Sequence, residues 1–331
     1  MFLQGLGTSA DVIGQMALLV LTGYLMVRKN WLSQGTMTDL TRFLIDVVIP
    51  CTFILSMVRS FSFDLLEESL VLALISAGWI LLSWGAGLGW FKLFPGDSPT
   101  KDRAVTGMMM ISNSLYLPLP VILAVTPVEF HDQAVVYISI VSLPSIIIMW
   151  TIGVKLLGGS AVVTGKERLK RVLNPPIVSL FAGILLSLIP GFRESARNEP
   201  GGVIPLTTIF QAMNYLSRLL SPMAMLILGG LIASAKNRSR IRIRYLLPLT
   251  LVRLILVPAG VYLIIQSGIT GIPALAATVL ILVAAAPPAT NHALIARRYN
   301  GEWGLVASLQ LITHVIALVT LPVWLSLGLG F

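Results

Sequence analysis

Charged residues and cysteine are both scarce in this chain. Only 11% of its 331 residues are charged, whereas soluble domains usually carry about 25%. The single cysteine, Cys51, cannot form an internal disulfide, and we interpret it as a small buried apolar side chain. The first ten residues contain neither Lys nor Arg, so a cleavable signal peptide is not expected. These shortages argue against a soluble domain and against a disulfide-stabilised secreted one.

The sequence also lacks a nucleotide-binding loop, a haem motif and a cluster of metal ligands, so no cofactor or bound metal is expected. Hydrophobic residues, in contrast, make up 56% of the chain, and its mean hydropathy is +0.89. Long apolar runs recur from one end to the other and leave no room for a separate soluble domain. The composition therefore predicts an all-α integral membrane protein.

A window of about 20 residues, the length that spans a bilayer core, locates ten hydrophobic spans. The first five lie near 10–28, 37–58, 69–93, 103–126 and 132–157, and the second five near 174–190, 205–234, 246–266, 272–296 and 304–328. In the third span, Gly85 and Gly89 are four residues apart, which predicts a close contact with another helix.

Basic residues gather on one side of these spans. The loops that follow the odd-numbered spans hold most of the 23 Lys and Arg residues, whereas the opposite side has only Arg59, Arg193 and Arg197. The positive-inside rule then places the basic loops in the cytoplasm and both termini outside a cell (inner) membrane. The net charge of +9 is explained by this topology and by attraction to anionic membrane lipid, so it gives no support to nucleic-acid binding.

Two spans are interrupted by prolines at corresponding places. The fourth span contains Pro118 and Pro120 after Asn113, and the ninth contains Pro287 and Pro288 before Asn291. A proline inside a helix removes a backbone donor and clashes with the preceding turn, which costs about 3 kcal/mol. In a membrane such a break persists only where it faces protein or a water-filled cavity. Paired breaks predict a secondary transporter whose binding site lies where the two broken helices cross.

The two halves share further landmarks. Pro50 in the second span and Pro222 in the seventh occupy equivalent places, and an intramembrane charge precedes each by four residues, Asp46 in one half and Arg218 in the other. Because each half has five spans, a duplicated half must be inverted in the membrane. We expect a first repeat at 1–158, a basic cytoplasmic linker at 159–173 and a second repeat at 174–331.

Four segments of the chain resemble the auxin efflux carrier family. They are Gly23-Tyr24 ahead of Arg28, the run 174–183 that begins Asn-Pro-Pro, the run 222–233 with its Gly-Gly pair, and the run 252–258, Val-Arg-Leu-Ile-Leu-Val-Pro. The family includes plant auxin carriers and bacterial permeases for malate or malonate. The resemblance covers essentially the whole chain and implies ten helices in two inverted repeats, related more distantly to the bile-acid sodium symporters.

The same resemblance implies that helices 4 and 9 cross at their prolines. Helices 1, 2, 6 and 7 would form a scaffold that also makes a homodimer, and helices 3–5 and 8–10 a moving transport domain. One departure stands in the fourth span, where Asn113 and Pro120 match the family pattern but Pro118 replaces a glycine. A second proline is expected to lengthen this break, and it puts a substrate carried over from the family in doubt.

Polar residues beside the breaks are the candidates for substrate binding. An asparagine can both donate and accept, so Asn113 could orient a carboxylate, or its amide could only satisfy backbone groups that the prolines release. Asn291 is its counterpart in the other half. The candidate binding residues are Asn113, Ser114, Tyr116, Pro118, Pro120, Pro287, Pro288, Thr290 and Asn291.

Five ionisable residues within the spans are candidates for charge or proton coupling. Arg253 could neutralise an anionic substrate, or pair with an acid or with backbone carbonyls, and the pairing is the favoured interpretation. Asp46 and Arg218 have opposite signs, so a mutual salt bridge is expected. His292 and His314 could carry a proton, although a hydrogen-bonded histidine is the simpler interpretation, with Gln310 as the expected partner of His314.

These observations predict a secondary carrier of a small organic anion, such as a mono- or dicarboxylate or an auxin-like acid, that works by alternating access. A channel or sensor built on a transporter fold is the alternative. An intramembrane enzyme is not expected, because no nucleophile and base stand at a suitable spacing. The sequence leaves open whether H+, Na+ or no ion is coupled to transport.

Overall fold

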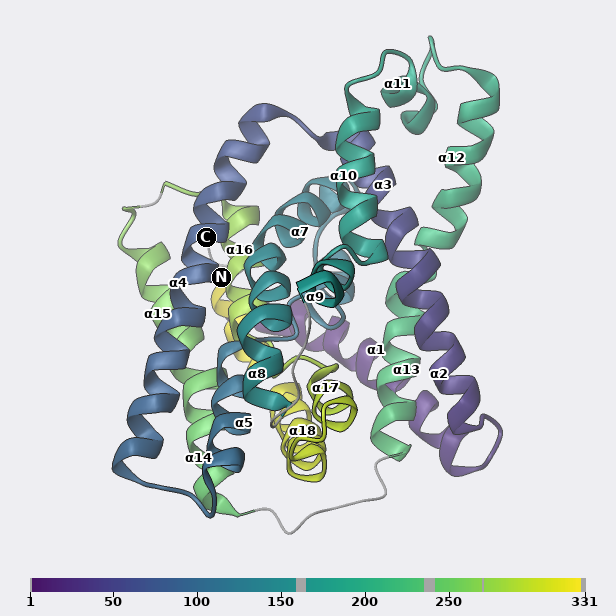
Figure 1. The fold of residues 1–331 in the computed structure, drawn as a ribbon. Coiled ribbons are helices and arrows are strands. Elements are labelled where there is room, and N and C mark those ends of the chain that lie inside the picture. Colours follow the sequence, from purple (N-terminus) through teal and green to yellow (C-terminus); the bar gives the residue numbers. More distant parts are fainter. Residues whose placement is uncertain (1, 159–164, 235–241, 270, 329–331) are drawn as a thin grey trace.

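The computed structural model describes residues 2–158, 165–234, 242–269 and 271–328, and within them the chain is helical without strands (Figure 1). The first half contains α1 (Phe2–Arg28), α2 (Gln34–Phe43), α3 (Ile49–Ser60), α4 (Phe63–Leu93), α5 (Pro99–Met110), α6 (Pro118–Val125), α7 (His131–Ile148) and α8 (Val154–Leu157). The second half contains α9 (Gly165–Val172), α10 (Pro175–Ser187), α11 (Phe192–Arg197), α12 (Ile204–Ser217), α13 (Leu220–Ser234), α14 (Ile243–Thr250), α15 (Val257–Gln266), α16 (Ala274–Ala285), α17 (His292–Arg298) and α18 (Trp303–Gly328).

Five helical stretches of the described chain are long and apolar enough to cross a membrane. They cover Gly35–Ser60, Phe63–Leu93, Val128–Leu157, Ile243–Gln266 and Trp303–Gly328. Each coincides with one of the predicted spans. Shorter apolar helices at Gly14–Arg28, Pro175–Ser187 and Ala274–Ala285 fall in three further predicted spans.

Irregular turns interrupt several of these helices. The predicted fourth span is divided into α5 and α6, the ninth into α16 and α17, and the seventh into α12 and α13. Three π-helical turns, at Leu44–Val48, Met149–Gly153 and Leu251–Leu256, join α2 to α3, α7 to α8 and α14 to α15. Such wide turns occur often at functional sites. Asp46 lies in the first of these π-helical turns and Arg253 in the third.

The backbones of α1 and α13 lie in direct contact. A methyl group added at Gly229 would meet the backbone of Val20 and Tyr24, and one added at Gly23 would meet the backbone of Leu226. Small residues are what allow membrane helices to approach this closely. Gly23 and Gly229 of the family motifs therefore lie at a close helix contact. The contact predicted at Gly85 and Gly89 is wrong, because both are exposed with no atom within 4 Å of an added methyl group.

Buried serines at a spacing of seven residues run along α4, which packs against α5 and α7. Ser69, Ser76 and Ser83 are all at most 1% exposed. Ser76 donates to the carbonyl of Val141 in α7 over 2.9 Å. Ser69 donates within α4 to the carbonyl of Leu65, and the hydroxyl of Ser83 has no partner among the described residues, so Ser76 is the member of this row that links α4 to α7.

The three basic residues predicted for the outer side converge near the C-terminal end of α3. Arg193 donates to the carbonyl of Phe61 over 2.6 Å, and Arg197 donates to the carbonyl of Arg59 over 2.5 Å. Both acceptors lie at the end of a helix, where carbonyls lack partners and carry partial negative charge. These two hydrogen bonds attach α11 to the end of α3.

Candidate functional site

The two broken segments meet each other through their backbones. The amide of Asn113 donates to the carbonyl of Pro287 over 2.7 Å, and the amide of Ala289 donates to the carbonyl of Ile111 over 3.2 Å. Ser112 and Pro288 lie opposite one another between these bonds as an isolated antiparallel bridge. Each break thus satisfies one backbone donor and one backbone acceptor of the other, as burial away from water requires.

The first break extends from Ile111 to Leu117, and Pro118 is the first residue of α6. Pro118 fits this position because a proline in the first turn of a helix loses no hydrogen bond of its own, and that it lengthens the break stays a prediction. A helix running through position 118 would place an amide against the carbonyl of Ser114. That carbonyl instead accepts from the hydroxyl of Ser142 on α7 over 3.2 Å.

Asn113 is 2% exposed and lies at the centre of the first break. Its side-chain oxygen accepts from the amide of Tyr116 over 3.1 Å. Its NH2 group has no hydrogen-bond partner among the described residues. The acceptor end of the amide therefore orders the break, and the donor end remains available.

The second break carries the corresponding polar residues before α17. Thr290 and Asn291 are both partly buried, and the carbonyl of Thr290 accepts from the side chain of Gln310 over 2.9 Å. Asn291 precedes the first residue of α17, but its side chain does not cap the helix. Within the described part of the chain the side-chain amide of Asn291 makes no hydrogen bond, so its NH2 group is also available to a ligand.

Arg253 is completely buried behind the second break and contacts the C-terminal end of α16. Its Nε donates to the carbonyl of Ala286 over 3.0 Å. One terminal nitrogen, Nη2, donates to the carbonyls of Ala284 and, over 3.4 Å, Val283. The sequence left open whether Arg253 pairs with an acid or with backbone carbonyls, and the structure shows it bound to carbonyls at the end of another helix. No acidic partner stands beside Arg253 among the described residues.

His292 and His314 lie in the same interior region, on α17 and α18. Nδ1 of His314 lies 2.8 Å from the backbone carbonyl of Gln310, so the expected partner residue is right, although the contact uses its main chain. His292 is completely buried, and neither of its ring nitrogens has a partner in the part of the chain that is described.

The expected salt bridge between Asp46 and Arg218 is not formed. Asp46 pairs instead with Arg42, one helical turn earlier, over 3.4 Å, and their side chains are 44% and 82% exposed. The neighbouring contact between their helices is a hydrogen bond of 2.9 Å between the hydroxyls of Thr52 and Ser217. The prediction failed because an acid four residues from an arginine on one helix already has a partner.

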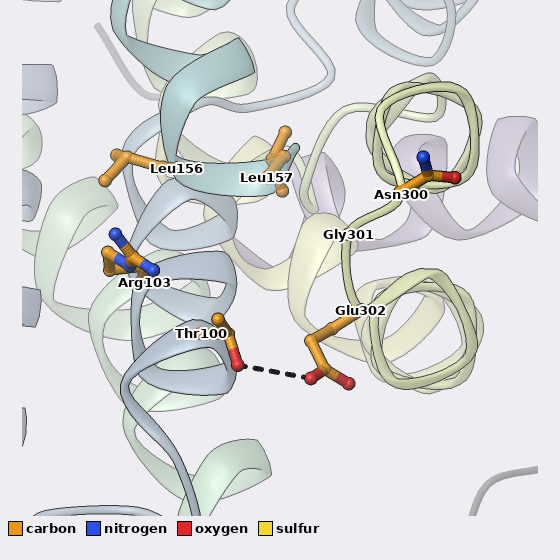
Figure 2. A pocket seen from close by; sticks show the side chains of 7 residues that line it. All are labelled: Thr100, Arg103, Leu156, Leu157, Asn300, Gly301 and Glu302. Atoms are coloured by element: carbon orange, nitrogen blue, oxygen red, sulfur yellow. Dashed lines mark hydrogen bonds between the residues drawn. The ribbon is translucent and has the colours of Figure 1, made fainter. Parts of the chain in front are cut away.

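A cavity of about 180 Å³ lies elsewhere in the molecule, between the first turn of α5, the end of α8 and the turn before α18 (Figure 2). Thr100 and Glu302 face each other across it and form a hydrogen bond of 3.3 Å. None of the predicted binding residues lines this cavity, so the site at the breaks and the cavity are separate features.

Sequence reasoning missed the side chains that support the first break. Ser142 is 1% exposed and lies on α7, 28 residues from its acceptor Ser114. No local pattern indicates that contact. Serines recurring every seven residues on α4, in contrast, were visible in the sequence as a signal for close helix packing.

Apolar helices of spanning length, two interrupted helices that bind each other at their interruptions, and buried polar groups at that point define a multi-pass helical membrane protein. A family model described as membrane transport protein matches residues 12–325, and the chain belongs to this family. The family predicted from the sequence motifs is thereby confirmed. Among curated proteins, the chain is 24% identical over 169 residues to Protein PIN-LIKES 2 of Arabidopsis thaliana. That match covers 50% of this chain and 36% of the plant protein.

Proposed function

We propose that this protein is a secondary carrier of a small organic anion, with the substrate bound where the two broken segments meet. The observation that carries the proposal is the pair of unused amides: Asn113 and Asn291 both lie beside the bridge between the breaks, and neither side-chain NH2 group has a partner among the described residues. Membership of a membrane transport family supports the same function.

The charge distribution favours an anion. Arg253 is buried without an acidic partner in the described chain, and it donates to the carbonyl of Ala286, next to Pro287. An uncompensated positive charge in a medium of low dielectric constant attracts an anion over several ångströms. Amide NH2 groups then suit a carboxylate, which only accepts hydrogen bonds. The substrate class in this proposal is therefore a small carboxylate.

Alternating access in this proposal rests on an inverted repeat at 1–158 and 174–331 joined by the basic segment 159–173. The helices of residues 1–60 and 174–234 form the scaffold and a homodimer contact, and the other helices form the moving domain. Ion coupling is part of the hypothesis through His292 or His314. Both termini lie outside a cell membrane in this arrangement, with the basic loops against anionic lipid in the cytoplasm.

We also infer that this conformation is closed at the outer end. There α3 packs on α7, and the hydroxyl of Ser56 donates to the carboxylate of Asp132 over 2.7 Å. The proposed counterparts in the second repeat are α13 and α18, and these two helices make at most a weak contact in the described residues. In this proposal the opening lies between α13 and α18 at the cytoplasmic end, while α1 and α13 remain packed against α18 and α6.

The test is uptake of radiolabelled malonate, malate and indole-3-acetate into liposomes that contain the purified protein. Asn113→Ala should lower uptake by about 10- to 100-fold, since a hydrogen bond to a charged ligand contributes about 1.5 to 3 kcal/mol. Asn113→Asp separates the two roles of this residue. Aspartate keeps an oxygen for the amide of Tyr116 but replaces the NH2 donor with an acceptor, so uptake should still be lost.

Asn214→Ala is the matched control, because Asn214 is a partly buried amide on α12, away from the breaks. It should transport as the unaltered protein does. Uptake by Asn113→Asp at the unaltered rate would refute the assignment of the site. Unitary electrical currents with no saturable uptake would show a channel instead, and recovery of chemically altered substrate would show an enzyme.

A further inference from the structure

Arg253 binds a distinctive pair of carbonyls. In an α-helix the amide of residue i donates to the carbonyl of residue i−4, so Pro287 and Pro288 leave the carbonyls of Val283 and Ala284 without their donors. Those two carbonyls are the acceptors of Nη2 of Arg253, and the carbonyl of Val283 also accepts from the amide of Ala286 over 3.4 Å. Nε of the same side chain donates to the carbonyl of Ala286, the residue that follows the end of α16.

We propose that Arg253 is a positioning residue that replaces the missing amides of Pro287 and Pro288 and so holds the second break in the shape that the site needs. This inference rests on the proposed function, since it assigns a role within the same site. A guanidinium group suits the task because its donors are fixed in one plane and can reach several acceptors at once.

The position of Arg253 explains how its contact with α16 affects the substrate site at the two breaks. It lies in the π-helical turn Leu251–Leu256, which is wider than an α-helical turn, and its side chain is completely buried. By fixing the carbonyl of Ala286, it fixes the start of the segment in which Pro287 accepts from the amide of Asn113. Asn113 in turn presents its free NH2 group. Arg253 thus acts on the substrate through the backbone bridge.

The buried charge of Arg253 is also compatible with this role. Carbonyls at the C-terminal end of a helix carry partial negative charge and lack intrahelical partners. The end of α16 supplies three acceptors for one guanidinium group, and Val283 alone of these three also has a backbone donor in its own chain segment, the amide of Ala286. A carbonyl left without a donor inside a membrane protein is costly, so the arginine and the two prolines stabilise one another.

The first experiment measures hydrogen exchange in the purified protein without substrate. In Arg253→Met, exchange of the amides of Asn113 and Ala289, which form the bridge, should rise at least about ten-fold, while amides in the middle of α4 should be unchanged. Arg103→Met is the control for loss of an arginine, because Arg103 is exposed and, among the described residues, donates only to the carbonyl of Pro99 in its own helix. Unchanged exchange at the bridge in Arg253→Met would overturn the proposal.

The second experiment asks whether the need for Arg253 depends on the prolines. Arg253→Met should lower the melting temperature by about 3 to 9 °C, because the buried carbonyls of Ala284 and Ala286 lose their arginine donor, whereas that of Val283 keeps the amide of Ala286. In the double variant Pro287→Ala/Pro288→Ala, the chain can supply its own amides to Val283 and Ala284. The shift caused by Arg253→Met should then be at most half as large, and an equal shift in both backgrounds would contradict the proposal.

The third experiment separates positioning from direct contact with the anion. Arg253→Lys keeps the charge but offers a single ammonium in place of the planar fork. If Arg253 positions the break, the lysine variant should keep a KM within about three-fold while its maximal uptake rate falls about ten-fold or more. A lysine variant with an unaltered rate and bridge exchange would refute the positioning role. Because the first two experiments need no substrate, loss of the proposed transport function would leave their outcome readable.

Discussion

Gly229→Ala should strongly destabilise the protein, because α1 and α13 touch through their backbones at this point. A methyl group at Gly229 would lie 2.8 Å from the amide nitrogen of Tyr24 and closer still to the carbonyl oxygen of Val20. Backbone atoms cannot rotate away as a side chain can, so the two helices must separate. Overpacking in an interior usually costs about 1 to 3 kcal/mol, and we expect the upper end or more for a clash with main chain.

The assay is the fraction of monodisperse protein that remains in detergent after heating. A loss of about 3 kcal/mol corresponds to a fall of about 4 °C in melting temperature for a chain of 331 residues, because the entropy of unfolding is about 2.1 cal/mol/K per residue. Gly85→Ala is the matched control, since Gly85 is exposed in the middle of α4 and its added methyl group would have no atom within 4 Å. Alanine there should be neutral or slightly stabilising, by up to about 1 kcal/mol.

Gly23→Ala is a second test of the same contact. Gly23 faces the backbone of Leu226, so its variant should be destabilised in the same way. Once one methyl group has forced the helices apart, the second should cost less, and Gly23→Ala/Gly229→Ala should lose less than the sum of the single variants. A melting temperature of Gly229→Ala equal to that of Gly85→Ala would refute the reasoning, as would full additivity.

Two more contacts give predictions of smaller size. Asp132→Asn should lower the free energy of unfolding by about 1 kcal/mol, because the amide can still accept from Ser56 but loses its charge beside Arg59, 3.7 Å away. Thermal unfolding at low and at high salt checks this, and a loss that is the same at both would contradict an ionic contribution. Ser142→Ala should cost about 1 to 3 kcal/mol, because the carbonyl of Ser114 loses the hydroxyl that donates to it, and an unaltered melting temperature would count against that contact.

The positions of the helix breaks could be predicted from the sequence because prolines act locally. A proline at position 287 or 288 stops a helix through its own missing amide and its own ring, whatever surrounds it. The structure ends α16 at Ala285 and begins α6 at Pro118 accordingly. The spans that form single long helices were predictable for a similar reason, since length and hydropathy are properties of a continuous segment.

The partners of intramembrane charges could not be predicted in the same way. Arg253 is 33 residues from Ala286, and nothing in the local sequence shows that it binds that carbonyl and not an acid. Asp46 was assigned to Arg218 on the sign of the charges, yet the nearer Arg42 on its own helix satisfies it. Pairing across helices depends on how each helix is rotated about its own axis and on the depth of each side chain in the membrane, and the hydropathy of the sequence determines neither.

The surroundings of the site differ in the two halves, although the backbone bridge is symmetric. Around Ser112 and Pro288, the amide of the residue that follows one donates to the carbonyl of the residue that precedes the other, in both directions. That two-fold pattern is what two copies of one segment would form in the inverted repeat that we propose.

The side chains that replace the proline amides do not follow the same symmetry. Arg253 provides charged donors to three carbonyls from one side, whereas Ser142 provides a single hydroxyl that also bonds within its own helix over 2.6 Å. Hydrogen bonds from charged donors are about twice as strong as neutral ones. Arg253→Met should therefore loosen the bridge much more than Ser142→Ala does, although the two residues support the same pair of backbone bonds. Equal loosening by both variants would mean that the bridge holds itself together.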